Sequence, residues 1–257
     1  MAFHQVAIPH ADIVSADFSS EVYAARLWDV YKNRGSDEYT DSKMFFAKTY
    51  FTNNMKKELD SIKKRLDGNG GGHFRSISTP FGGGKTHTLI ALYHKCSEWG
   101  VKPVVLVGNE IDPNKHTLWA MIEEQLTGNI TRLTKQVPHG GEELRKLLKD
   151  QNSPILILID ELLQYIIKAD GIIVEKTTLA EQTLVFIQEL SEAVSSFPNI
   201  CVVATLPSSA NEHLDNERYT KLYEMLKDLA GRTRDMMTPI SDNDVPKIIR
   251  QRLFSNT

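Results

Sequence analysis

Three short apolar runs constrain the fold of this chain more than any other feature. They are "KPVVLVGN" at 102–109, "PILILID" at 154–160 and "NICVVAT" at 199–205. The second is the most apolar run in the chain, too short for a core helix and rich in isoleucine. Helical patterns separate or flank the runs, at 86–99, 117–126, 141–150, 177–197 and 216–230. Continuous apolar strands that alternate with helices predict an α/β fold whose parallel sheet is covered by helices on both faces.

Two further strands complete a predicted five-stranded, mostly parallel sheet. "FRSIST" at 74–79 is one, and "DMMTPI" at 235–240 is the candidate for the other. Right-handed crossovers then place the carboxyl ends of the strands, and the loops that follow them, along one edge of the sheet. In sheets of this kind ligands bind at that edge.

The N-terminal part of the chain carries weaker patterns. A short helical pattern within 18–33 precedes a predicted loop at 33–42, and Thr52 is predicted to cap a helix over 53–66. We therefore expect residues 1–52 to be an N-terminal extension and residues 53–257 to form the core.

Composition limits the classes of function. The chain has 257 residues and a net charge of only −3, so no global basic field indicates a polyanion partner, although a local patch would suffice for DNA. No apolar run approaches the roughly 20 residues that span a bilayer, and the N-terminus lacks the pattern of a secretory signal. The two cysteines, Cys96 and Cys201, are expected to be buried thiols, which favours the cytoplasm.

The stretch "TPFGGGKTHT" at 79–88 lies between the first predicted strand and the next helix, where a phosphate-binding loop belongs. Consecutive glycines adopt backbone angles closed to other residues, so their N–H groups can curl around phosphate oxygens. The lysine reaches the β- and γ-phosphates, the threonine hydroxyl binds Mg²⁺, and the positive end of the helix points at the same place. The candidate nucleotide-binding residues are Pro80, Phe81, Gly82, Gly83, Gly84, Lys85, Thr86 and His87.

The loop departs from the full G-x-x-x-x-G-K-[ST] pattern at its first position, where this chain has Thr79. Residues before proline favour extended backbone angles. The loop can therefore start with an extended Thr79 in place of a glycine and still contain the Gly-Gly-Gly-Lys-Thr half that contacts phosphate. The alternative is a glycine-rich turn before a surface lysine. For His87, lining the site and packing beside it are both open.

A buried strand that ends in Asp160 and Glu161 places two carboxylates at the ligand edge of the sheet. In a P-loop ATPase, Asp160 would hold Mg²⁺ through its water shell, and Glu161 would orient and polarise the attacking water. The alternative is that both acids cap the next helix. The lysine loop comes first and one strand intervenes, and two half-motifs in this order favour nucleotide chemistry.

Thr205 ends the strand at 199–205. If this strand lies between the strand before the lysine loop and the Asp160 strand, Thr205 faces the γ-phosphate and the attacking water and senses whether that phosphate is present. The alternative is an ordinary threonine that bonds to its own backbone.

With these residues, the chain resembles the AAA+ branch of P-loop ATPases, which has an added strand between the lysine loop and the paired acids. Three stretches are similar to sequences of a large prokaryotic ATPase family first catalogued as a domain of unknown function: "TPFGGGKTHTLIALYHK", "TLWAMIEEQLTG" and "ILILIDELLQYI". Some members are encoded in phage-defence clusters of the phage-growth-limitation type, beside DNA methyltransferases. The resemblance covers residues 20–254.

The AAA+ resemblance implies a ring or partial ring, in which an arginine from a neighbouring subunit reaches the γ-phosphate. Arg232 and Arg234 lie in the expected window and Arg218 is the runner-up, with ordinary surface arginines as the alternative. Tyr50 and Phe51 lie where a flanking segment often folds over adenine, with core packing as the alternative. A helical lid usually follows the fifth strand, and here we expect it to be largely absent.

The sequence therefore predicts an Mg²⁺-dependent ATPase, built as a three-layer P-loop NTPase sandwich of AAA+ type, which uses hydrolysis to remodel or move a protein or DNA partner, with no membrane partner. The alternative is a nucleotide-dependent switch or scaffold that hydrolyses little, and a kinase ranks below both. The candidate catalytic residues are Glu161, Lys85, Thr205, Arg232 and Arg234. The candidate metal ligands are Thr86 and Asp160.

Overall fold

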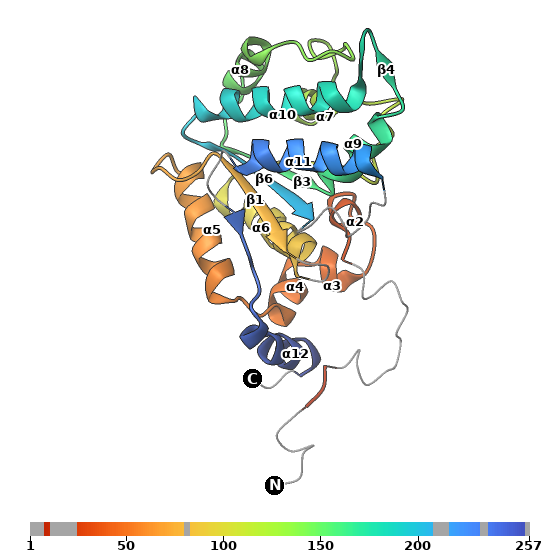
Figure 1. The fold of residues 1–257 in the computed structure, drawn as a ribbon. Helices are drawn as coiled ribbons and strands as arrows, with labels where there is room; N and C mark the ends of the chain where they lie inside the picture. Colours follow the sequence, from red (N-terminus) through yellow and green to blue (C-terminus); the bar gives the residue numbers. More distant parts are fainter. Residues whose placement is uncertain (1–7, 11–24, 80–82, 208–215, 232–235, 255–257) are drawn as a thin grey trace.

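A parallel sheet forms the centre of the molecule (Figure 1). The computed structural model describes residues 8–10, 25–79, 83–207, 216–231 and 236–254. Within them the order of the strands in the sheet is β2-β3-β6-β1-β7, and each neighbouring pair is parallel. The strands are β1 (Phe74–Thr79), β2 (Lys102–Val107), β3 (Ile155–Asp160), β6 (Ile200–Pro207) and β7 (Met236–Met237). The predicted α/β fold with a mostly parallel five-stranded sheet is confirmed.

Helices lie on both faces of this sheet, which makes a three-layer sandwich (Figure 1). One layer contains α2 (Leu27–Tyr31), α3 (Asp37–Thr40), α4 (Ser42–Lys48), α5 (Asn53–Leu66) and α6 (Lys85–Trp99). The other contains α7 (Leu118–Thr127), α8 (Gly141–Lys149), α9 (Leu162–Ala169), α10 (Leu179–Ser195) and α11 (Glu217–Gly231). A short hairpin, β4 (Ile173–Val174) and β5 (Thr177–Thr178), joins α9 to α10.

The alternation of side chains along each strand divides the core in two. In β2, Val104 and Leu106 belong to the cluster under α7 to α11, whereas Val105 and Val107 belong to the cluster under α2 to α6. Successive strand residues point to opposite faces, so a strand that is apolar at every position must be covered on both. This is why β2, β3 and β6 contain few polar residues.

The helix starts follow from local capping. Thr52 accepts a 3.0 Å hydrogen bond from the amide of Met55, so the predicted cap of α5 is confirmed. Thr178 and Glu181 form a reciprocal capping box at the start of α10.

The prediction of a loop over 33–42 was wrong, because this stretch contains α3 and the first residue of α4. Asp41 caps α4 by accepting a 2.8 Å hydrogen bond from the amide of Met44, and the buried Tyr39 and Phe45 hold the two short helices on α6. Of the helix predicted within 18–33, the described part is α2, which packs against α6 and β2, while residues 18–24 lie outside the described residues.

The chain after β7 returns to the N-terminal helices. Residues 238–240 lead to a 3-10 turn (Asp242–Asp244) and to α12 (Val245–Leu253). The Gln251 amide donates to the carbonyl of Ala47 in α4, and Pro9 forms a β-bridge with Phe254. This segment therefore packs beside α4, at one end of the sandwich (Figure 1).

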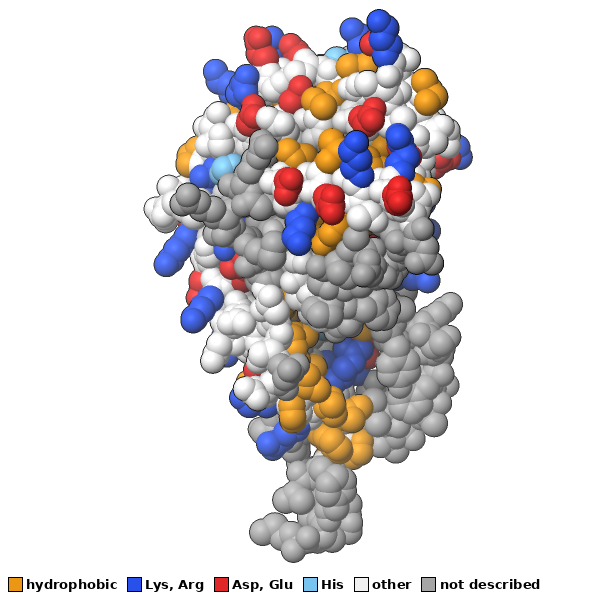
Figure 2. Space-filling view, viewed as in Figure 1, with side chains coloured by type: hydrophobic (Ala, Val, Ile, Leu, Met, Phe, Trp, Pro, Cys, Tyr) orange, Lys and Arg blue, Asp and Glu red, His pale blue; other side chains and the backbone are white. Residues whose placement is uncertain are grey.

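The surface over α10 and α11 carries acidic and basic side chains close together (Figure 2). Among the described residues, none of the helices combines the length and the apolar character needed to cross a membrane. Both cysteines are buried, as expected from the sequence, and burial raises the pKa of the Cys96 thiol to about 12.

Candidate functional site

The carboxyl ends of β1 and β3 bring Thr86 and Asp160 into contact. The Thr86 hydroxyl donates a 2.8 Å hydrogen bond to Oδ2 of Asp160, across 74 positions of sequence. Asp160 is the last residue of β3 and is only 3% exposed, and Thr86 lies in the first turn of α6. The residues predicted as metal ligands therefore lie side by side.

Thr205 joins the same cluster from β6. This strand lies between β1 and β3, which is the condition on which the prediction for Thr205 depended. Its hydroxyl donates a 2.6 Å bond to Oδ1 of Asp160 and accepts a 2.9 Å bond from the amide of Glu161. Thr205 therefore links both carboxylate residues of the predicted motif.

The surroundings of Asp160 make the charge of its carboxylate unfavourable. Burial raises the pKa of this carboxyl, and the hydrogen bonds from Thr205, Thr86 and the Glu161 amide, together with the charge of Lys85, counter that effect only in part. A divalent cation beside the carboxylate would compensate the charge in a way that these donors do not.

Glu161 has a backbone conformation that is rare for a residue with a side chain. Its φ of 50° and ψ of 41° lie in the left-handed region, and its side chain is exposed at the end of β3. Within the described residues it makes no side-chain capping bond to α9, which argues against the alternative that it serves as a helix cap. Strained non-glycine backbone of this kind occurs at functional sites, where surrounding structure holds it in place.

The described part of the glycine loop is a tight turn that leads directly into α6. Gly84 has a φ of 77°, which favours glycine, and it precedes α6, whose first residue is Lys85. The Lys85 ammonium donates a 2.6 Å bond to the carbonyl of Thr79, at the end of β1. Thr79 is part of that strand and thus extended, as its place before proline predicted. Pro80, Phe81 and Gly82 lie outside the described residues.

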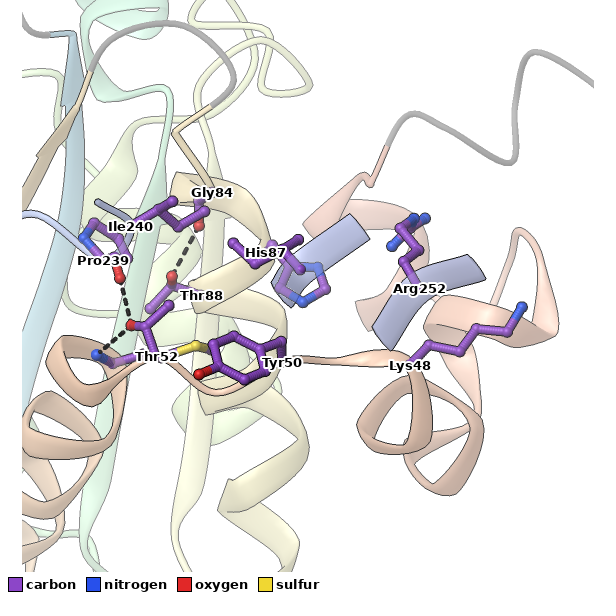
Figure 3. A pocket seen from close by; sticks show the side chains of 11 residues that line it. Lys48, Tyr50, Thr52, Gly84, His87, Thr88, Pro239, Ile240 and Arg252 are labelled. Carbon is purple, nitrogen blue, oxygen red and sulfur yellow. Dashed lines mark hydrogen bonds between the residues drawn. The ribbon is translucent and has the colours of Figure 1, made fainter. Parts of the chain in front are cut away.

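A cavity of about 180 Å³ opens beside Gly84 and the first turns of α6 (Figure 3). Tyr50, Thr52, Met55, Pro239 and Ile240 line it together with Gly84, His87, Thr88, Lys48, Ile248 and Arg252. Its apolar residues come from segments before β1 and after β7. Of the two aromatic candidates, Tyr50 lines the cavity, and Phe51 packs against the core cluster that contains α5 and α6.

His87 both lines this cavity and packs beside it. Its Nε2 lies 3.0 Å from the Thr49 hydroxyl, and its ring centroid lies 4.6 Å from that of Phe45. Burial, assisted by the charge of Arg252, lowers the pKa of His87 to about 4, so the ring is neutral at physiological pH. It contributes shape rather than charge.

One wall of the cavity contains an ion cluster that the sequence did not predict. The buried carboxylate of Glu38 lies 3.1 Å from the Lys48 ammonium and 2.6 Å from the Arg252 guanidinium. These contacts join α3, α4 and α12. No local pattern marks them, because the three charges are separated in sequence and meet only after α12 has docked.

The arginines predicted to act in trans are placed only in part. Arg232 and Arg234 lie outside the described residues. Arg218, at the start of α11, forms a two-armed ion pair with Asp170, with a 2.6 Å bond to Oδ1. This pairing holds the pKa of Asp170 below its usual value and ties α11 to the end of α9.

The donor set suits a cation that keeps most of its water. In the described part of the chain, no group of three or more His, Cys, Asp or Glu side chains could hold a metal ion. Thr86 and Asp160 nevertheless offer two hard oxygen ligands, and Mg²⁺ is usually bound through one or two protein oxygens plus phosphate and water.

This architecture defines an α/β protein of the P-loop sandwich class. A comparison with protein families matches residues 1–102 and 100–241 to the DUF499 N-terminal domain, and the chain belongs to that family. No curated protein matches. Among solved structures, the chain is similar to one in "Structure of Drosophila ORC bound to AT-rich DNA and Cdc6", with 11% identity and a TM-score of 0.35. The similarity covers 80% of this chain and 64% of that one, less than two thirds of its length.

Proposed function

We propose that this chain binds ATP with Mg²⁺ and hydrolyses the nucleotide as an AAA+ type ATPase. The observation that carries the proposal is the convergence of Thr86, Asp160 and Thr205 at the start of α6, directly after the Gly-Lys-Thr turn. A turn of glycine before a surface lysine has no need of a buried aspartate from a strand two places away in the sheet. A site for a triphosphate and its cation requires that arrangement.

Binding of phosphate would exchange one set of contacts for another. The Lys85 ammonium would leave the Thr79 carbonyl for phosphate oxygens, a charge-assisted partner. Thr86 and Asp160 would hold Mg²⁺, which supplies neutralisation of phosphate charge. The start of α6 contributes N–H groups and the positive end of its dipole.

Glu161 would act as the general base. Its side chain is exposed next to Asp160, where a water could lie between it and the γ-phosphate. Glu161 would accept the proton of that water as its oxygen bonds to the γ-phosphorus, while the bond from that phosphorus to the bridging oxygen breaks and ADP leaves. Thr205 would hold the backbone of Glu161 and the carboxylate of Asp160 in one arrangement, so that cation and base are placed together.

The cavity beside Gly84 would take the nucleoside. It adjoins the start of α6, and apolar residues such as Tyr50, Met55 and Ile248 line it, as expected for a base that binds by stacking and shape. The hydroxyl of Thr52 is bonded to the carbonyl of Pro239, and that of Thr88 to the carbonyl of Gly84. These side chains therefore shape the cavity.

Hydrolysis of ATP would drive work on another macromolecule. The family resemblance suggests remodelling of a protein or DNA partner, with phage defence as one setting, and self-assembly with Arg232 or Arg234 reaching a neighbouring site. Arg218 is the weaker candidate because it is paired with Asp170. We expect Arg232→Ala or Arg234→Ala to lower turnover without lowering thermal stability. Arg218→Ala should lower thermal stability and spare turnover.

A nucleotide-dependent switch with little hydrolysis is the second candidate. The closed contacts of the described site favour it, because Asp160 is already bonded to Thr86 and Thr205, and Lys85 to Thr79. In that case ATP would rearrange these bonds, and turnover would be negligible.

Titration of fluorescent ATP and measurement of phosphate release test both candidates. Lys85→Ala should weaken binding more than about 10-fold, while Lys57→Ala, exposed on α5, should not. Glu161→Gln should keep binding and lower turnover about 10²- to 10⁴-fold, with the exposed Glu110→Gln as its control. Binding without turnover in the wild type would favour the switch, and equal binding by wild type and Lys85→Ala would contradict both.

A further inference from the structure

Gly108 lies in unusually close contact with the backbone of Glu161. It is the first residue after β2, and its amide donates a 2.9 Å bond to the carbonyl of Asp160. A Cβ at this position would lie 2.1 Å from the carbonyl oxygen of Glu161 and 2.9 Å from the amide nitrogen of Tyr165. Real Cβ atoms essentially never come within 3.0 Å of a heavy atom outside their own residue and its two chain neighbours. Position 108 therefore has no room for a side chain while Glu161 stays where it is.

Glu161 is also held from the opposite side, by Thr205 of β6. The amide of Glu161 donates to the Thr205 hydroxyl at 2.9 Å, and its carbonyl accepts the first helical bond of α9 from Gln164, also at 2.9 Å. The left-handed backbone of Glu161 thus lies between Gly108 on one side and Thr205 on the other. The direction of its side chain depends on both neighbours.

The rest of α9 is tied to the loop that follows Gly108. The Lys168 ammonium donates a 3.3 Å bond to the carbonyl of Gly108 and another bond to the carbonyl of Asn109. The buried Tyr165 donates a 3.1 Å bond from its hydroxyl to the carbonyl of His116. The helix that begins at Glu161 is therefore anchored to the loop after β2 along its length, and Gly108 sets how closely the two approach.

We infer that Gly108 is a positioning residue for hydrolysis: the absence of a side chain at the end of β2 sets the position of the general base Glu161. This inference rests on the proposed function. A Cβ at 108 would have to push the Glu161 carbonyl by about 0.9 Å, from 2.1 to 3.0 Å. Displacements of about 1 Å can lower a catalysed rate by about 100-fold. The glycine loop follows β1, and the cavity is lined by residues of α4 to α6 and of the chain after β7, so Gly108 belongs to neither and ATP binding should be unaffected.

Gly108→Ala tests the inference, with Gly171→Ala as a matched control. Gly171 follows α9 and has open space where its Cβ would be. We expect Gly108→Ala to lower kcat about 100-fold with the Kd for ATP within about twofold of wild type, and Gly171→Ala to change neither. In a Glu161→Gln background the alanine should lower the residual rate no further, because the residue through which it acts is gone. A further 100-fold loss in that background would overturn the inference.

Two more measurements cover the other outcomes. A crystal structure of Gly108→Ala should show the Glu161 backbone displaced by about 1 Å relative to Asp160, and an unmoved Glu161 would overturn the inference even in a protein without turnover. A wild type that binds ATP without hydrolysing it would contradict the proposed function. The displacement of Glu161 in the Gly108→Ala structure would still decide whether Gly108 sets the position of Glu161. If Gly108→Ala does not fold, Lys168→Met loosens the same contact without adding bulk at 108, and it should lower kcat with unchanged Kd. A Lys168→Met variant with wild-type kcat would then overturn the inference.

Discussion

The Thr205 hydroxyl donates a 2.6 Å hydrogen bond to Oδ1 of Asp160, 45 positions apart in sequence. Asp160 ends β3, and Thr205 lies two residues before the end of the neighbouring parallel strand β6. The same oxygen accepts the amide of Glu161 at 2.9 Å. A hydroxyl is suited to this place because it donates and accepts at once. The residue proposed to hold the cation and the residue proposed to activate water are therefore connected through one atom of the neighbouring strand, β6.

Removal of this hydroxyl should damage hydrolysis more than binding. Thr205→Val keeps the shape of the side chain but loses both bonds, so Asp160 and Glu161 are no longer held together. We expect kcat to fall about 10- to 100-fold while the Kd for ATP changes by less than about threefold. Thr205→Ser, which keeps the hydroxyl, should retain most of the rate. Equal rates for the valine and serine variants would show that the hydroxyl has no part in the reaction.

The raised pKa of Asp160 predicts a variant that is more stable and inactive. Because burial raises the pKa in the folded state above its unfolded value, the folded protein binds this proton more tightly, and stability falls as pH rises through that window. Above the folded pKa the full penalty of the charge is present. Asp160→Asn removes it, and we expect Tm to rise by about 2–4 °C, the shift that roughly 1 kcal/mol gives in a chain of this size.

Thermal unfolding from about pH 4.5 to 8 measures the effect, and the difference between the two proteins should shrink toward the acid end, where Asp160 takes up its proton. ATP with Mg²⁺ should raise the Tm of the wild type and not that of Asp160→Asn. A variant that is less stable than wild type at pH 7 would contradict this account of Asp160.

The sequence predicted the parts of the fold that depend on local pattern. The strand at Ile155–Asp160 was found within one residue, because a strand covered on both faces must be apolar at almost every position. The convergence of Thr86 with Asp160 followed from the same logic, since carboxyl ends of parallel strands meet at one edge.

The parts that were missed depend on tertiary contacts. The helix at Asp37–Thr40 is one turn long, and no local pattern distinguishes it from a loop until Glu38 meets Lys48 and Arg252. Ile240 and Ile248 line the cavity only because the chain after β7 returns to α4 and α5. The close approach of Gly108 to Glu161 is also invisible in sequence, because it depends on the path of the chain after two adjacent strands.

A bulky residue in the cavity should separate nucleoside binding from phosphate binding. Ile248 in α12 lines the cavity, while its neighbour Ile249 is 51% exposed and does not. Ile248→Trp should fill the space and weaken ATP and ADP about 10-fold or more, leaving the affinity for pyrophosphate unchanged, because the phosphate end lies at Gly84 and Lys85. Ile249→Trp should bind all three ligands like the wild type. An Ile248→Trp variant with normal ATP affinity would place the nucleoside elsewhere.

The carboxylate of Glu123 in α7 is predicted to hold the loop after that helix. It is 1% exposed and accepts bonds from the amides of Thr131, Arg132 and Leu133 and from the Thr131 hydroxyl. Burial alone would raise the pKa of Glu123, but these donors outweigh burial and hold it below its usual value. The stability that they provide is present at neutral pH and is lost as pH falls through the folded pKa.

Glu123→Gln would set an N–H₂ group against backbone donors and should lower the free energy of unfolding by about 1–3 kcal/mol in urea titrations at pH 7. The exposed neighbour Glu124→Gln should change it little, and equal stabilities of the two variants would show that the buried carboxylate does not hold the loop.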